Sequence, residues 1–565
     1  MGLDFSAYRC LAEALRDSCE RHRSRTALIE VDRDEEKARL TYGDVLREGE
    51  RLASLLIERG LKPGDRCVLL LPNQSKWVVT AAAVMWAGGI VVPIDVKLGP
   101  WDQAGLIDYA EPALIVTDAD LWRQVEPLRK GAGRSCPVIF ANGGPSESSW
   151  DASAAVRADL PRLRDRGDIA AIIFTSGTGG DPKGCMISDG AYMAQMVSID
   201  KIFPLTTKDR YLSIIPANHV VDFMCGFLLS LMSGAAVVHQ RTLRSQYIVD
   251  TMKKYRITCT ALVPLLLRSL RDGILEGLKN LPPVKRKIIG ALMSLNRLLT
   301  RRRPLFGLSR LLLKPIHDRF GGCLSRFVVG GSFVDPEHAD FFYGIGFGIH
   351  IGYGLTEICT VIALNDLRPY RGDTVGPIVQ GGEVEIRNVC ENGVGEVWIR
   401  APFLMSGYFK NEKLTSETIV DGWLHSGDLG RLEGGHLKLT GRSKNVIVTE
   451  GGKNIYPEDV ETAFRNIEEC DEYCVFADHY VWPQEKGRGD RLILILRPKE
   501  WAFSAGDFSE KIRQANHRLD YHKRISGYLV WERPFPRTAS LKVKREGLAL
   551  VIRNEGPRPE HVVPV

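Results

Sequence analysis

Apolar and polar positions in the first third of the chain follow two alternating periods. Residues 41–60, "TYGDVLREGERLASLLIERG", place apolar side chains at three- and four-residue intervals, which predicts an amphipathic helix capped by Thr41 and ended by Gly60. Residues 65–73, "DRCVLLLPN", form a short apolar run typical of a buried strand, and residues 77–95 repeat the helix-then-strand order. Strands that alternate with helices form mainly parallel sheets with both faces covered. The pattern therefore predicts an α/β fold.

The pattern changes after about residue 395. Residues 422–442, "GWLHSGDLGRLEGGHLKLTGR", alternate in short runs separated by Gly and Asp, which predicts antiparallel hairpins. We therefore expect a large N-terminal domain of mainly parallel α/β sheets with a β-rich subdomain, and a small α+β C-terminal domain. The predicted boundaries are 1–441 and 442–565.

The composition fits a globular protein of more than one domain. The chain has 565 residues, of which 44% are hydrophobic and 25% charged. A net charge of +6 suits anionic small molecules and is too diffuse to indicate nucleic-acid binding. Twelve scattered cysteines without a CxxC pair indicate reduced thiols in a cytoplasmic protein. The most apolar segment, residues 223–238, is too short to span a membrane and reads as a buried helix that runs into a strand.

A basic segment, residues 272–320, is rich in Leu, Lys and Arg. Its helical spacing of leucines before the triple arginine at 301–303 allows two interpretations. One is a basic amphipathic helix at a membrane surface, which would make membrane contact peripheral at most. The other is a helical hairpin packed on the body with a solvated basic edge. Pro304 and Gly307 favour the second, since they interrupt any long continuous helix.

The densest run of loop-forming residues is "FTSGTGGDPKG", residues 174–184. Backbone N–H groups of glycines, hydroxyls and a lysine together suit a phosphate cradle. The P-loop pattern fails because Lys183 is preceded by Pro182 and followed by Gly184, and the dinucleotide pattern GxGxxG fails as well. The alternative is an ordinary flexible connection between elements.

Four further motifs favour the phosphate interpretation. They are "IGYGLTE" (351–357), "GWLHSGDLGRL" (422–432), "LTGRSKNVIVTEGGKNIYPEDVE" (439–461) and "FPRTASLKVKRE" (535–546). With the loop, and in this order, they resemble the signature motifs of the acyl-adenylate-forming superfamily. The last two are most similar to the long-chain fatty acid–CoA ligase subgroup, and the resemblance runs from Tyr42 to Arg545.

This resemblance implies an AMP-forming acid–thiol ligase with a mobile C-terminal domain. ATP and Mg²⁺ would activate a medium- or long-chain fatty acid as an acyl-adenylate, and CoA would then accept the acyl group. Two alternatives stay open: transfer to an acyl-carrier protein, and a nucleotide-binding homologue that has lost catalysis. The chain departs from the superfamily pattern at Gly179, where a second Thr is usual, and at Leu541, where Gly is usual.

The resemblance also assigns the binding of phosphates and metal. The loop would hold the β- and γ-phosphates, and Glu357 would hold Mg²⁺ together with Thr178, because a hard cation that bridges phosphates needs few protein ligands. The loop residues so assigned are Thr175, Ser176, Gly177, Thr178, Gly179, Gly180 and Lys183.

Adenine and ribose would bind at two other motifs. Tyr353 would stack on adenine, and Asp428 would accept hydrogen bonds from the ribose hydroxyls with Arg442 nearby. The structural alternatives are that the glycines at 330–331 only end the preceding strand and that Asp428 only stabilises a turn. The remaining residues of the adenine pocket would be Gly331, Ser332, Gly352, Gly354 and Thr356.

The C-terminal motifs would supply catalysis and movement. Lys542 would bridge the carboxylate and the α-phosphate, with Lys544 as the alternative. Lys444 matches the hinge position, and Gly451 and Gly452 would line the pantetheine tunnel.

The acyl pocket has one candidate residue. His219, in "IPANHVVD", stands where the superfamily carries a histidine beside the acyl chain. It would gate acyl entry, or it is a hydrogen-bonded core histidine.

Overall fold

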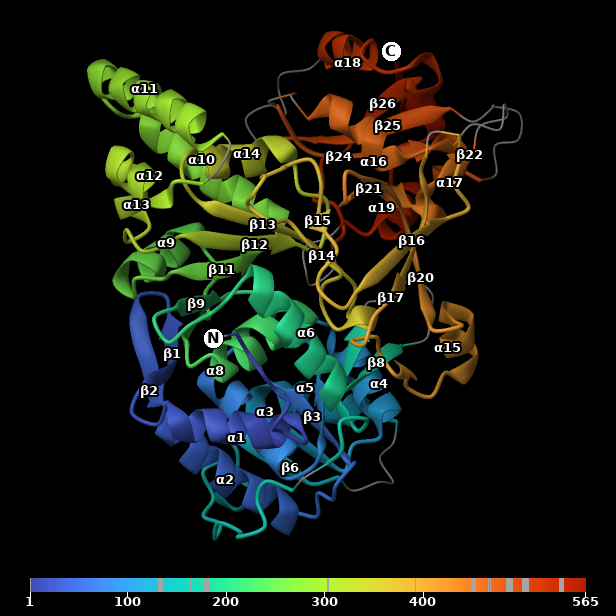
Figure 1. Cartoon of the computed structure of the whole chain (residues 1–565). Helices are drawn as coiled ribbons and strands as arrows, with labels where there is room; N and C mark the ends of the chain where they lie inside the picture. Colours follow the sequence, from blue (N-terminus) through green and yellow to red (C-terminus); the bar gives the residue numbers. More distant parts are fainter. Residues whose placement is uncertain are drawn as a thin grey trace. The chain divides into compact units, whose positions relative to one another are not determined.

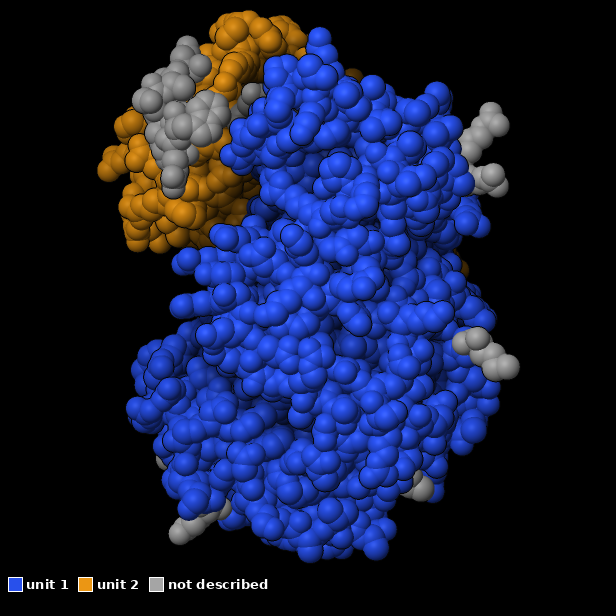
Figure 2. Space-filling view, turned by 90° about the vertical axis from the view of Figure 1, so that its left-hand side faces the viewer, with its two compact units in different colours: residues 1–383, 399–424 blue, residues 384–398, 425–565 orange. Residues whose placement is uncertain are grey.

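A computed structural model gives the fold in two compact units (Figure 2). Unit 1 comprises residues 1–383 and 399–424, and unit 2 comprises residues 384–398 and 425–565. The division differs from a single cut at residue 441, because hairpin strands before that residue group with the C-terminal part. The functional boundary at residue 441 stays a prediction. The residues that the structure describes are 2–130, 136–162, 164–175, 182–301, 304–391, 393–448, 454–465, 467, 469–483, 491–499, 508–537 and 543–565.

A seven-stranded sheet organises the first part of unit 1 (Figure 1). Its strand order is β18-β8-β7-β4-β3-β5-β6, and the run from β7 to β6 is parallel while β8 and β18 are antiparallel to their neighbours. Its strands are β3 (Arg66–Leu70), β4 (Ile90–Pro93), β5 (Leu114–Asp118), β6 (Val138–Asn142), β7 (Ile169–Thr175), β8 (Lys183–Ser188) and β18 (Gly407–Tyr408). The helices of this part are α1 (Leu11–Arg21), α2 (Tyr42–Glu58), α3 (Ser75–Trp86), α4 (Pro100–Ala110), α5 (Ala119–Val125) and α6 (Asp189–Ile202).

An eight-stranded sheet organises the rest of unit 1. Its order is β14-β13-β12-β11-β9-β10-β1-β2, parallel from β13 to β1, with an antiparallel strand at each edge. Buried aromatic and aliphatic side chains form its core, among them Phe327, Phe342 and Phe347. The strands are β1 (Thr26–Asp32), β2 (Glu35–Thr41), β9 (Arg210–Ser213), β10 (Ala236–Gln240), β11 (Cys259–Leu262), β12 (Arg326–Gly330), β13 (Gly348–Tyr353) and β14 (Ala363–Leu364). The α/β prediction is confirmed.

The apolar segment 223–238 is confirmed as buried helix followed by strand. It continues α7 (Val220–Asp222) as a π-helix, η3 (Phe223–Leu229), then passes through α8 (Ser230–Met232) into β10. No helix in the described ranges is both long enough and apolar enough to cross a membrane.

The basic segment folds as several helices of unit 1, of which α10 contacts β12 of the eight-stranded sheet. α10 and α11 each pack against α14, which agrees with a segment packed on the body, and α11 ends before Pro304, consistent with the helix-breaking effect of that residue. The hairpin interpretation stays a prediction. The segment holds the end of α10 (Pro264–Lys279) and all of α11 (Pro283–Thr300), α12 (Phe306–Leu312) and α13 (Lys314–Arg319), and it lies between α9 (Ser245–Lys254) and α14 (Pro336–Gly344).

Unit 2 contains the predicted antiparallel hairpins. β20 (Trp423–Glu433) pairs antiparallel with β21 (His436–Arg442) in a sheet that also holds β17 (Gly395–Arg400) and β16 (Glu383–Arg387). A second sheet has the order β24-β25-β26-β27, with ranges β24 (Cys470–Ala477), β25 (Leu492–Pro498), β26 (Gly527–Val530) and β27 (Val563–Pro564). Its helices include α16 (Pro457–Glu461), α18 (Ser509–Asn516) and α19 (Arg545–Glu555).

Candidate active site

The glycine-rich loop joins the two strands of a hairpin, not a strand and a helix. Thr175 at the end of β7 faces Lys183 at the start of β8. A Cβ at Gly184 would lie 2.9 Å from a methyl carbon of Ile172, so a larger residue here would force that side chain to move. The assignments to Ser176, Gly177, Thr178, Gly179 and Gly180 lie outside the described residues. The two described ends of the predicted phosphate loop are therefore held side by side.

Lys183 and Glu357 are brought into one cluster by Tyr408. The Tyr408 hydroxyl donates a 2.8 Å hydrogen bond to Oε1 of Glu357, and Lys183 Nζ lies 5.9 Å from the centroid of the Tyr408 ring. β18 carries Tyr408 to this place by pairing with β8, in the register Tyr408 to Cys185. Burial, and secondarily the negative charge of Glu357, raise the pKa of Tyr408 well above its ordinary value, so the hydroxyl stays a donor at neutral pH.

Sequence reasoning missed Tyr408. It lies 51 residues from Glu357 along the chain and belongs to no motif that the sequence singled out. Only the pairing of β18 with β8 shows that it joins the site. The backbone strengthens the same junction, since Met405 N donates to Glu357 O at 2.8 Å and Ser406 N to Met186 O at 2.8 Å.

The glycine motifs proposed for the adenine pocket lie side by side on adjacent strands. β12 and β13 pair in parallel with Gly330 opposite Gly352, and a Cβ at Gly330 would lie 2.7 Å from the Gly352 carbonyl oxygen. Tyr353 ends β13 and is buried, while Gly331 and Ser332 are exposed. The structure therefore places Tyr353 next to the segment predicted to form the opposite wall.

Gly354 is required by close backbone packing. A Cβ at this position would lie 1.8 Å from the carbonyl oxygen of Thr360, which no side chain tolerates. The chain then turns through the short 3₁₀ helix η4 (Thr356–Ile358), which carries both Thr356 and Glu357. The glycine in "IGYGLTE" thus permits the turn that presents the carboxylate.

Asp428 and Arg442 form a paired unit on the β20–β21 hairpin of unit 2. They are directly opposite in the strand register, and Arg442 Nε lies 2.8 Å from Asp428 Oδ1. Asp428 is buried, whereas Arg442 is exposed. The predicted neighbourhood of these residues is present, and their role toward ribose stays a prediction.

For the other residues predicted to act from unit 2, the structure gives only the local position of the described ones. Lys444 is exposed in a single 3₁₀ turn, η5 (Ser443–Asn445), directly after β21. Gly451, Gly452 and Lys542 lie outside the described residues. Lys544 is described and exposed, and it stands directly before the first residue of α19 without a capping hydrogen bond from its side chain.

His219 caps the short helix that starts the π-helical segment. Its Nδ1 accepts a 3.3 Å hydrogen bond from Val221 N, and its side chain is half-buried. A capping contact agrees with a structural role, and the partial exposure leaves the gating role open.

A buried polar network next to His219 was also missed by sequence reasoning. Asp222 receives hydrogen bonds from Tyr211 at 3.0 Å and Ser213 at 2.6 Å, and His239 Nδ1 lies 3.0 Å from Ser213 Oγ. Burial raises the pKa of Asp222 to about 7 and lowers that of His239 to about 4. The network ties β9 and β10 to α7, so it fixes the position of the loop that carries His219.

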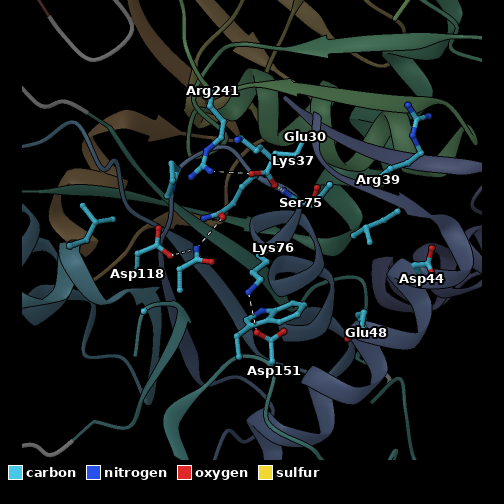
Figure 3. Close-up of a pocket in the computed structure, with 18 of the residues that line it drawn as sticks. Glu30, Lys37, Arg39, Asp44, Glu48, Ser75, Lys76, Asp118, Asp151 and Arg241 are labelled. Atoms are coloured by element: carbon cyan, nitrogen blue, oxygen red, sulfur yellow. Dashed lines mark hydrogen bonds and ion pairs between the residues drawn. The ribbon is translucent and has the colours of Figure 1, made fainter. Parts of the chain in front are cut away.

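A polar groove of about 1030 Å³ lies elsewhere in unit 1 (Figure 3). Charged residues of both signs line it, including Glu30, Lys76 and Arg241, and ion pairs join Arg241 to Glu30 and Lys76 to Asp151. None of the predicted site residues lies among those that line it. The groove is thus separate from the cluster of Lys183, Tyr408 and Glu357.

Comparison with known proteins finds relatives of this chain. A family model described as AMP-binding enzyme matches residues 15–409. The chain is 27% identical over 468 residues to long chain acyl-CoA synthetase 2 of Arabidopsis thaliana, covering 75% of this chain and 69% of that protein. It is 26% identical over 546 residues to a chloroplastic long-chain-fatty-acid–[acyl-carrier-protein] ligase of the same plant, covering 81% and 73%.

The fold matches solved structures as well. O-succinylbenzoate coenzyme A synthetase from Bacillus subtilis, in complex with ATP and magnesium ion, superposes with a TM-score of 0.75 at 21% identity. The match covers 95% of this chain and 98% of that chain.

Proposed function

Because the chain belongs to the family of AMP-binding enzymes, we propose that it is a fatty acid–CoA ligase that works through an acyl-adenylate. The observation that carries the proposal is the cluster at the ends of the glycine-rich loop, where a lysine and a carboxylate meet around Tyr408. A medium- or long-chain fatty acid is the proposed substrate, supported by relatives named long chain acyl-CoA synthetases.

The proposed reaction has two steps. A carboxylate oxygen of the fatty acid attacks the α-phosphorus of ATP, a C–O–P linkage forms, and the bond to the β-phosphate breaks to release pyrophosphate. The thiol of CoA then attacks the acyl carbon, loses its proton to solvent, and displaces AMP. Two anions must approach each other in the first step, so positive charge and oriented donors carry most of the catalysis.

The chain's own residues divide this work. Lys183 and the loop from Thr175 would hold the β- and γ-phosphates, and Lys542 would neutralise charge between the carboxylate and the α-phosphate. Asp428, held by Arg442 at 2.8 Å, would accept hydrogen bonds from ribose. Tyr353 and the adjacent glycines would enclose adenine.

Glu357 suits a Mg²⁺ site. Carboxylate oxygen is a preferred ligand of this hard cation, and Tyr408 orients the group by binding Oε1. Thr178 would be the second protein ligand. Bound Mg²⁺ would neutralise the charge that develops on the leaving pyrophosphate.

We place the enzyme in the cytoplasm. All twelve cysteines are free thiols, which suits a reducing compartment.

An acyl-carrier protein is the second candidate acceptor, favoured by the relative named as a ligase for that protein. Purified CoA and a purified acyl-carrier protein, offered side by side, distinguish the two by the product formed. A pyrophosphate-release assay across saturated fatty acids of graded length would define the acid. We expect release to depend on the acid, to peak at medium or long chains, and to be accompanied by AMP. ATP binding without AMP release would support a catalytically impaired homologue instead.

Replacing Lys542 by Ala tests the catalytic assignment. We expect acid-dependent exchange of pyrophosphate into ATP to fall at least a hundredfold, while thiolysis of preformed acyl-AMP persists, since only the first step needs this charge. Lys544→Ala, a like change two residues away, is the matched control and should retain exchange. The reverse result would transfer the role to Lys544.

A further inference from the structure

A segment of unit 1 lacks acidic residues over an unusual length. Between Gly277 and His317 the sequence has ten Lys and Arg residues and no Asp or Glu. The segment comprises the end of α10, all of α11 and α12, and the start of α13. In Figure 1, α11 lies at the edge of unit 1.

One face of α11 is fixed to the body. Asn296 Nδ2 donates a 2.7 Å hydrogen bond to the carbonyl of Gly344, and the Tyr343 hydroxyl donates a 3.0 Å bond to the carbonyl of Thr300. Leu292 and Met293 pack against the buried core beneath. These contacts hold the helix in one orientation against α14.

The outer face of α11 is apolar and exposed. Five side chains on it are between 42% and 69% exposed, at offsets of 0, 4, 11, 14 and 15 residues from the first. These offsets place them in one stripe about 100° wide on the helix. α12 adds Leu308, which is 38% exposed, and Leu311, which is 73% exposed. The five residues are Val284, Ile288, Leu295, Leu298 and Leu299.

Exposed basic side chains lie on the same helix, and at 100° per residue Lys285 and Lys287 fall just outside the two edges of the stripe. Lys285, Arg286 and Lys287 are exposed in the first turns of α11, and Arg297 and Arg301 are exposed near its end. A long exposed apolar stripe is uncommon on a surface that meets only water. An apolar stripe flanked by cations matches the interface of a bilayer, where acyl chains lie beneath anionic head groups.

We propose that the outer faces of α11 and α12 form a docking surface for an anionic lipid bilayer. The charge favours this partner over a second copy of the chain, because two such faces would bring like charges together. Docking would hold unit 1 at a surface into which fatty acids partition. The proposal goes beyond the proposed ligase function, and its test needs no activity measurement.

The test is sedimentation of the full chain with vesicles of phosphatidylcholine alone or with about one third phosphatidylglycerol. We expect binding only to the anionic vesicles, and weaker binding as salt is raised, since salt screens exposed charges. The triple variant Lys285→Glu, Arg286→Glu, Lys287→Glu should lower the partition coefficient at least tenfold. A matched triple variant at exposed lysines elsewhere in unit 1, Lys62→Glu, Lys201→Glu and Lys208→Glu, should lower it less than threefold.

The apolar contribution is tested separately. Leu298→Ser with Leu311→Ser should also lower binding at least tenfold, whereas Val156→Ser with Trp101→Ser, at positions that are also more than half exposed, should not. All these positions are exposed, so the variants should keep the thermal transition of the parent. Equal binding to both vesicle types, or equal losses in test and control variants, would overturn the proposal. A dimer that the parent chain forms without lipid, and that Leu298→Ser abolishes, would also overturn the proposal. That result would identify the face as an interface between copies.

Discussion

At the scale of single residues, Tyr408 links the two charged groups of the candidate site. Its hydroxyl binds Glu357 and its ring lies beside Lys183, so it acts on the reaction through its neighbours. A positioning residue of this kind should affect metal use more than the fold.

Tyr408→Phe removes only the hydroxyl. We expect the Mg²⁺ concentration for half-maximal adenylation to rise about tenfold, because a hydrogen bond to a charged group contributes roughly 1.5–3 kcal/mol. Adenylate formation titrated with Mg²⁺ measures this. Tyr109→Phe, which removes a hydroxyl that donates at 2.8 Å to the Phe409 carbonyl, is the matched control. An unchanged Mg²⁺ requirement in Tyr408→Phe would remove the positioning role.

Asp222 makes stability depend on pH with a definite sign. Burial raises its pKa to about 7, so the folded chain binds a proton that the unfolded chain releases at pH values above about 4. The contribution of Asp222 is therefore full at low pH and is lost as pH rises from about 4 to 7. Relative to Asp222→Asn, the parent should lose stability across this window, by at most about 1.4 kcal/mol per pH unit.

Thermal unfolding of both proteins at closely spaced pH values measures the difference. Asp189, whose carboxylate accepts from Leu11 N at 2.9 Å and whose pKa burial raises to about 6, offers a comparison. Relative to Asp189→Asn, the parent should likewise lose stability as pH rises, over a window that ends nearer pH 6. A difference for Asp222→Asn that stays flat between pH 4 and 7 would contradict the assignment.

At the scale of elements, the start of α2 shows local sequence acting alone. Thr41 Oγ1 accepts from Asp44 N at 3.1 Å, and Asp44 Oδ2 accepts from Thr41 N at 2.8 Å, which is a complete capping box. The sequence predicted this cap, because its residues are only three apart.

Thr41→Ala should weaken the first turn of α2 by about 1 kcal/mol. Hydrogen exchange of amides 44–46 should then be about fivefold faster, while exchange in α3 should not change. Thr41→Ser keeps the hydroxyl and should restore the protection. Equal exchange in the Ala variant and the parent would show that tertiary packing alone holds this turn.

At the scale of the whole molecule, the proposed mechanism needs a change of arrangement between the two half-reactions. Lys444 lies in an exposed turn directly after β21, at the predicted hinge. Lys444→Pro fixes one backbone angle there. We expect it to slow one half-reaction at least tenfold and leave the other within threefold. Lys444→Ala, which removes the side chain but leaves the backbone free, should retain both. Equal loss of both half-reactions in the proline variant would argue against a hinge.

The sequence by itself determined the alternation of helices and strands, the change to hairpins near residue 395 and the glycine positions of the motifs. Each depends on neighbours within one element or turn, as the cap at Thr41 does. The resemblance implied that Asp428 and Arg442 lie near each other, and the hairpin that the sequence predicts connects them. Tertiary structure alone decided the rest. Tyr408 reaches Glu357 through a strand pairing that no local pattern encodes, and the Asp222 network depends on side chains from separate elements. The sequence also did not determine that the apolar stripe on α11 is exposed. It shows which residues share a helix face but not which face the body covers.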